Sequence, residues 1–122
     1  MNKKNKKFEL EEIIRRVIKF RDDRNWKKFH NPKNLAISIS IEANELLEHF
    51  QWKDLKESKK YAENNKDKIS SEIADIIIYL LYLCHDLNID LADSIDKKMK
   101  ENNSKYPISK SKGKSLKYNQ LK

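Results

Sequence analysis

Apolar residues recur every three or four positions along four stretches of the chain, and this spacing predicts amphipathic α-helices. The third stretch has the densest apolar run, from Ile73 to Leu83, and is therefore predicted to be the central helix. One Gly and two Pro in 122 residues leave few helix breakers, so an all-α fold is expected. The predicted helices cover residues 8–24, 32–50, 66–87 and 90–104.

Local signals define the ends of these helices. Asn31 is a good N-cap, with Pro32 in the first helical position, and Asp90 caps the fourth helix in the same way. Residues 37–41 alternate as a strand would, but the helical pattern on both sides favours a helix. The remaining segments are predicted as a loop at 25–31, a polar connector at 52–65 with a short helix around 55–63, and a mostly extended tail at 108–122.

The net charge of +8 is concentrated at the two ends. Residues 1–7 carry four lysines and residues 105–122 carry six, which leaves 17 basic and 19 acidic side chains between them. We interpret the chain as one domain over residues 1–122, with a basic N-terminal end at 1–7 and a basic tail at about 107–122. A nucleic-acid binder would carry a basic stripe on a folded face, so such a partner is unlikely.

Several common functional classes are disfavoured by the remaining composition. Cys84 is the only cysteine and excludes an intramolecular disulfide. The basic N-terminus is not followed by the apolar segment of a signal peptide, and the apolar run of the third helix is too short to span a membrane. A cytoplasmic protein without a membrane partner is therefore expected. Apolar and charged residues each make up 38%, so oligomerisation is expected to cover apolar helix surface.

Two pairs of carboxylates are the candidate chemistry of this chain. Glu42 and Glu45 are three residues apart on one predicted helix, and Glu72 and Asp75 are three apart on the next. Each pair therefore shares a helical face, and two facing pairs would offer oxygen ligands to a hard cation such as Mg²⁺, with Mn²⁺ as a substitute. Helical carboxylates are usually solvated, but Asp75 lies within an apolar run, where an unpaired charge is costly.

The motifs Glu42-Ala-Asn-Glu45 and Glu72-Ile-Ala-Asp75 carry a family resemblance. Their flanking segments are RNWKKFHNPKNL, FQW, DIIIYLLYL and KMKENNSKYP. With these segments, the chain from about Leu10 to Tyr118 resembles the MazG-like all-α nucleoside triphosphate pyrophosphohydrolases, and within them the dCTP pyrophosphatase branch. The sequence departs from the family pattern at Ile41, where many relatives have a further Glu, and at Val17, where some dCTP-hydrolysing relatives have a substrate-facing His.

The resemblance implies a fold, a reaction and a set of site residues. The implied fold is a four-helix bundle that assembles as a homodimer or homotetramer, with active sites near subunit interfaces. The implied reaction is Mg²⁺-dependent hydrolysis of a nucleoside triphosphate, here dCTP, to the monophosphate and pyrophosphate. By position, Glu42, Glu45, Glu72 and Asp75 would hold the metal and carry catalysis. The implied substrate-binding residues are Trp26, Lys27, Lys28, Phe29, His30, Trp52, Asp75, Lys98, Asn102 and Tyr106.

Two alternatives remain open from the sequence. A related pyrophosphohydrolase would act on dUTP or on a broad set of nucleoside triphosphates. A helical module with basic tails would instead bind nucleic acid or a protein partner without hydrolysing nucleotides.

Overall fold

The computed structural model of the protein describes residues 9–122, so the predicted basic segment 1–7 lies outside the described residues. Across residues 9–122 the chain forms helices and no strand, which confirms the all-α prediction. The α-helices are α1 (Leu10–Asp23), α2 (Pro32–Glu48), α3 (Leu55–Asn64), α4 (Lys66–Asp86), α5 (Leu91–Lys105) and α6 (Ile108–Ser111). The short 3-10 helices are η2 (Lys27–Phe29) and η3 (Tyr118–Gln120). No helix in this part of the chain is long and apolar enough to cross a membrane.

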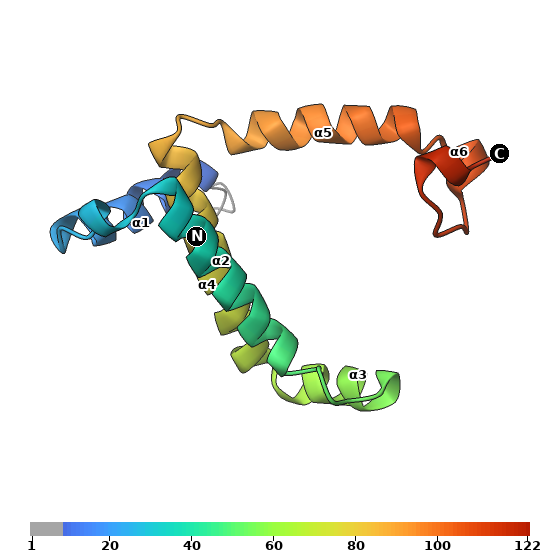
Figure 1. The fold of residues 1–122 in the computed structure, drawn as a ribbon, viewed down its shortest axis with the longest axis horizontal. Helices are drawn as coiled ribbons and strands as arrows, with labels where there is room; N and C mark the ends of the chain where they lie inside the picture. Colours follow the sequence, from blue (N-terminus) through green and yellow to red (C-terminus); the bar gives the residue numbers. More distant parts are fainter. Residues whose placement is uncertain (1–8) are drawn as a thin grey trace, which may run out of the picture. The chain divides into compact units, whose positions relative to one another are not determined.

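Helix α4 is the central element of the first compact unit of the chain, which ends at Leu87. Figure 1 shows α2 lying along α4, and α1 and α3 also contact α4. The buried apolar side chains are few among the described residues, namely Leu35 of α2 and Leu81 and Tyr82 of α4. The prediction of a central third helix is therefore confirmed, around a small core.

The predicted caps are present. The Asn31 side chain accepts a hydrogen bond from the Asn34 backbone N–H at 2.8 Å, and Pro32 opens α2. Asp90 caps α5 by accepting from the Asp93 N–H at 3.0 Å. The strand-like residues 37–41 are helical, as predicted. The Ser40 hydroxyl donates to the Ala36 carbonyl at 3.0 Å, so this polar side chain is satisfied within the helix.

The second compact unit, Asn88–Lys122, corrects one prediction. Residues 108–122 are not a mostly extended tail, because they contain α6 and η3. The Pro107 carbonyl accepts from the N–H groups of Lys110 and Ser111 at 2.9 Å, which opens α6. The Tyr118 ring lies edge-on to Tyr106 at 6.2 Å, an aromatic contact that packs the end of the chain within this unit. The four principal helices are present, while their assembly into one bundle stays a prediction.

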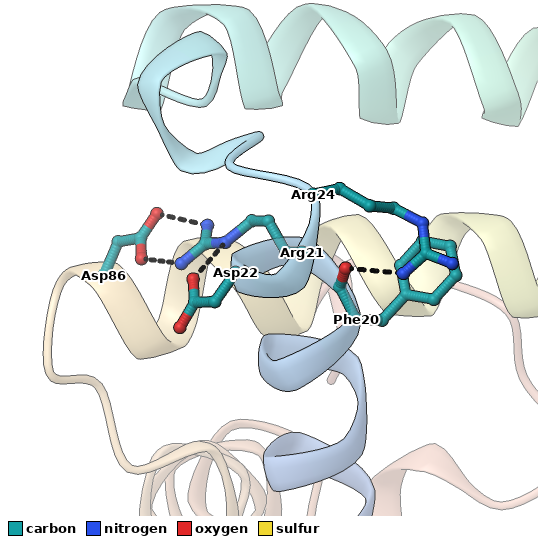
Figure 2. Close-up of polar contacts among 5 residues, drawn as sticks. All are labelled: Phe20, Arg21, Asp22, Arg24 and Asp86. Atoms are coloured by element: carbon teal, nitrogen blue, oxygen red, sulfur yellow. Dashed lines mark hydrogen bonds and ion pairs between the residues drawn. The ribbon is translucent and has the colours of Figure 1, made fainter.

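A buried ion pair joins α1 to the end of α4. Arg21 is fully buried, and its two terminal nitrogens donate to the Asp86 carboxylate at 2.9 and 2.7 Å (Figure 2). The guanidinium also lies 4.8 Å from the centre of the Tyr82 ring, a cation–π contact. The hydrogen bonds from Arg21 hold the pKa of Asp86 below its ordinary value. The buried charge of Arg21 is therefore compensated by Asp86. The two parallel hydrogen bonds also fix the position of α1 relative to the end of α4.

Replacing Asp86 with Ala should destabilise the protein by about 3–5 kcal/mol, because it leaves the buried Arg21 charge without its partner. Urea denaturation measures this loss. The double variant Arg21→Met with Asp86→Leu should recover most of it, since replacing both charges by apolar groups removes the desolvation penalty.

The pH dependence provides the control for this prediction. The pKa of Asp86 is lowered in the folded protein. The stability that the ion pair contributes is therefore fully present above the ordinary Asp pKa and is lost as pH falls through the lowered value. The gap in free energy of unfolding between the wild-type protein and Asp86→Asn should narrow over that acidic range. A gap that stays constant there, or a double variant as unstable as Asp86→Ala, would contradict the role of the pair.

Candidate active site

The two helices that carry the predicted carboxylates bring three of them together. Glu42 and Glu45 lie on α2 and Glu72 lies on α4. One carboxylate oxygen from each lies within 4.8 Å of the others. Three negative charges at this separation repel one another, so the arrangement favours a divalent cation among them.

The polar atoms of this cluster fit such an ion. Oε2 of Glu42 and Oε2 of Glu72 are buried and have no hydrogen-bond partner within the protein. Burial, followed by the adjacent Glu45 carboxylate and the charges of Asp75 and Glu72, raises the pKa of Glu42 above its ordinary value. Unpaired buried carboxylate oxygens are costly, and a hard cation with oxygen ligands would compensate them. The three residues can therefore hold a metal ion.

Asp75, the fourth predicted ligand, lies one turn after Glu72 on α4 and is half-buried. It is not part of the group of three whose oxygens lie within 4.8 Å. Its charge nevertheless acts on Glu42, and both residues line the same pocket. This position is compatible with a role toward the ion or toward a bound ligand.

A cavity of about 700 Å³ adjoins the carboxylates in the first unit. Glu42 and Asp75 contribute to its wall together with Trp26 and His30, two of the predicted substrate-binding residues. The wall also includes Val17 and side chains that sequence analysis did not select, namely Arg16, Phe20, Tyr79 and Tyr82. A mostly apolar pocket with a few polar groups beside an acidic cluster is typical of a site for an organic ligand that carries a metal-bound phosphate.

His30 is held firmly in this wall. Its ring stacks on Tyr82 at 5.2 Å and meets the edge of Tyr79 at 6.2 Å. Burial, followed by the nearby positive charge of Arg21, lowers the pKa of His30 below its ordinary value. His30 is therefore neutral at pH 7, and its Nδ1 is buried without a hydrogen-bond partner. A neutral imidazole with a free nitrogen can bind a polar atom of a ligand.

The other predicted substrate-binding residues are not among those that line this cavity. Lys27, Lys28 and Phe29 form η2 and are exposed. Trp52 follows α2 in a turn and is 86% exposed. Lys98, Asn102 and Tyr106 belong to the second unit, where Lys98 pairs with Glu101 at 3.4 Å. Their proposed role toward the ligand stays a prediction.

The site also has a neighbour that sequence analysis missed. His49, the C-cap of α2, has Nε2 3.7 Å from Oε1 of Glu72 and Nδ1 2.7 Å from the Tyr61 hydroxyl. Its spacing in the sequence could have indicated this position. His49 is four residues after Glu45 and seven after Glu42, so the three share one helical face. The predicted loop at 25–31 likewise contains a helical turn, η2, that its sequence did not indicate.

Comparison with known proteins places the chain in a family. Residues 37–121 match the MazG-like family. The chain is 36% identical to dCTP pyrophosphatase 1 of Rattus norvegicus over 114 residues, which cover 92% of this chain and 67% of that protein. Identity to dCTP pyrophosphatase 1 of Homo sapiens is 33% with the same coverage.

A solved structure agrees with this result. A pyrophosphatase from Archaeoglobus fulgidus superposes with a TM-score of 0.78 at 45% identity, covering 83% of this chain and 94% of that one. These relatives are pyrophosphatases, which confirms the predicted enzyme class, nucleoside triphosphate pyrophosphohydrolase. The matched family segment contains both carboxylate pairs, and the protein therefore belongs to the MazG-like family.

Proposed function

We propose that this protein hydrolyses a nucleoside triphosphate, preferentially dCTP, to the monophosphate and pyrophosphate in a Mg²⁺-dependent reaction. The observation that carries the proposal is that Glu42 belongs both to the three-carboxylate cluster and to the wall of the cavity. A triphosphate bound to a metal at the cluster would thus have its nucleoside beside Trp26 and His30. The names of the mammalian relatives support dCTP as the substrate.

Each part of the site has a role in this proposal. Glu42, Glu45 and Glu72, together with Asp75, would hold Mg²⁺, which when bound neutralises phosphate charge and polarises a water. One of these carboxylates accepts a proton from the attacking water. Water attacks the α phosphorus, and pyrophosphate leaves. Trp26 offers an indole face to the base, and such stacking contributes about 1–3 kcal/mol per base.

A second candidate substrate is dUTP, or a broad set of nucleoside triphosphates. Val17 lines the cavity and brings no hydrogen-bonding group to it. Discrimination between bases would then depend on other polar groups of the wall, such as His30, Tyr79 and Asp75. A site that hydrogen-bonds a base discriminates far more strongly than one that only encloses it.

The exposed apolar surface supports assembly as a homodimer or homotetramer. Ile73 of α4 and Ile37 of α2 are 44% and 46% exposed, and further large apolar side chains of these helices are exposed as well. Ile13, Phe20 and Ile77 are exposed and also line the cavity. A second copy that covered this surface would close the cavity at the subunit interface. It would also give the exposed Trp52 a nucleoside to contact in the neighbouring subunit.

Replacing Glu42 or Glu45 with Gln should stabilise the metal-free protein while abolishing its response to metal. Two like charges no more than 4.8 Å apart repel by about 1 kcal/mol or more even at the dielectric constant of water. Thermal denaturation should show a higher Tm than wild type without metal and no rise on adding Mg²⁺. Turnover of nucleotide should fall at least 100-fold with an unchanged helical CD signal.

Glu63→Gln, on the exposed surface of α3, is the matched control and should behave as wild type. Glu45→Gln with near-full activity would refute the metal-site assignment.

Substrate preference should appear in a panel of deoxynucleoside and ribonucleoside triphosphates with pyrophosphate as the readout. We expect dCTP to have the highest kcat/KM. If dUTP or dATP is hydrolysed as efficiently as dCTP, the dCTP assignment must be abandoned in favour of the broader alternative.

Sedimentation velocity should show a dimer or tetramer, because α2 and α4 carry large exposed apolar side chains that a second copy would cover. Ile73→Lys should dissociate the assembly and lower activity, since the cavity would lose its cover. Ser70→Lys, at another exposed position of α4, is the control. A monomeric wild-type protein with full activity would contradict the interface proposal.

A further inference from the structure

His49 and Tyr61 connect the candidate metal ligand Glu72 to helix α3. The His49 ring lies between the two residues, with Nδ1 2.7 Å from the Tyr61 hydroxyl and Nε2 3.7 Å from Oε1 of Glu72. The side chains of His49 and Glu72 are 18% and 20% exposed. Three elements, the end of α2, α3 and α4, thus contribute one side chain each to a half-buried row.

One tautomer of His49 suits both of its neighbours. A carboxylate acceptor at Glu72 is matched by an imidazole that carries its proton on Nε2. In a neutral imidazole the other nitrogen is then an acceptor, and Tyr61 donates its hydroxyl hydrogen to Nδ1. The Nε2 to Oε1 distance exceeds hydrogen-bond range, and a shift of about 0.8 Å would bring it to the usual 2.9 Å.

The two oxygens of Glu72 have different surroundings. Oε1 faces His49, whereas Oε2 is buried and has no hydrogen-bond partner in the protein. Oε2 is therefore a buried oxygen that a cation could compensate. If Nε2 came within hydrogen-bond range of Oε1, the resulting hydrogen bond would restrain rotation of the carboxylate, as outer hydrogen bonds do at metal sites.

His49 is itself restrained. Lys53 donates to the His49 backbone carbonyl at 2.7 Å, and its ammonium lies 4.3 Å from the centre of the Tyr61 ring. The Tyr61 ring packs tilted on His49 at 5.6 Å and edge-on to Phe50 at 6.0 Å. Turning the imidazole away from Glu72 would break its hydrogen bond and its ring contact with Tyr61, so these contacts hold its orientation.

We propose that His49 and Tyr61 are positioning residues that orient the Glu72 carboxylate for a divalent cation. The proposal rests on the proposed metal-dependent function, because it assigns these residues a role toward the ion held by Glu72. It also gives helix α3 a use in the site, since Tyr61 is its contribution.

The test measures metal affinity in the absence of nucleotide, with Mn²⁺ as the probe and electron paramagnetic resonance as the readout. His49→Leu should weaken Mn²⁺ binding about 10–100-fold, the usual effect of losing an outer hydrogen bond at a metal site. His49→Gln, whose amide N–H can replace the Nε2–H, should restore most of the affinity. Tyr61→Phe keeps the aromatic packing but removes the donor to Nδ1, and should give an intermediate loss.

Kinetics with dCTP and varied Mg²⁺ provide the second readout. His49→Leu should raise the Mg²⁺ concentration needed for half-maximal rate by a similar factor, with kcat at saturating Mg²⁺ within about twofold of wild type. A general loss of structure would instead lower kcat and Tm together. His85→Leu, an exposed histidine at the other end of α4, is the matched control.

The outcomes separate this proposal from the proposed function. Wild-type affinity for Mn²⁺ in both His49→Leu and Tyr61→Phe would overturn the positioning role and leave the enzyme assignment intact. A wild-type protein that binds no Mn²⁺ would overturn the metal site and the positioning role together. If His49→Leu does not fold, Tyr61→Phe decides by the same measurement.

Discussion

The buried pair of Arg21 and Asp86 is the interaction on which the first unit depends. The apolar core of this unit is small. The specific contact between α1 and α4 therefore depends largely on a bidentate hydrogen-bonded charge pair. The Arg21 carbonyl also accepts from the Trp26 N–H at 3.1 Å, which starts the turn leading to η2. Arg21 therefore has two roles. Its side chain joins α1 to α4, and its carbonyl helps to position the turn that carries Trp26 and leads to His30.

The carboxylate cluster, in contrast, destabilises the first unit. Glu42, Glu45 and Glu72 repel one another across α2 and α4, and two of their oxygens are buried without partners. Such an arrangement lowers stability in the absence of a cation and is typical of residues placed for function. The extensive contact of α2 with α4 holds the carboxylates together despite this repulsion.

The sequence predicted the helices and the pairing of the two carboxylate motifs, because periodicity and caps are local signals. Asn31 and Asp90 act as caps where predicted, and Glu42, Glu45 and Glu72 converge as expected. The Arg21–Asp86 pair joins residues 65 positions apart, and no local pattern reveals such a contact. α6 was missed because four residues give too little periodicity. The spacing of His49 from Glu42 and Glu45 places it on their helical face, but its contact with Tyr61 of another helix has no local sequence signal.

Some apolar side chains that line the cavity are also exposed to solvent. Phe20 and Ile77, for example, form part of the wall and are also exposed, so the first unit by itself leaves the cavity open to water on that side. Charged groups interact more weakly in water than in a closed site, because water screens them. Covering the apolar rim with a second chain would therefore both bury surface and strengthen the binding of a metal-bound phosphate. Assembly and catalysis would then depend on the same face of α1 and α4.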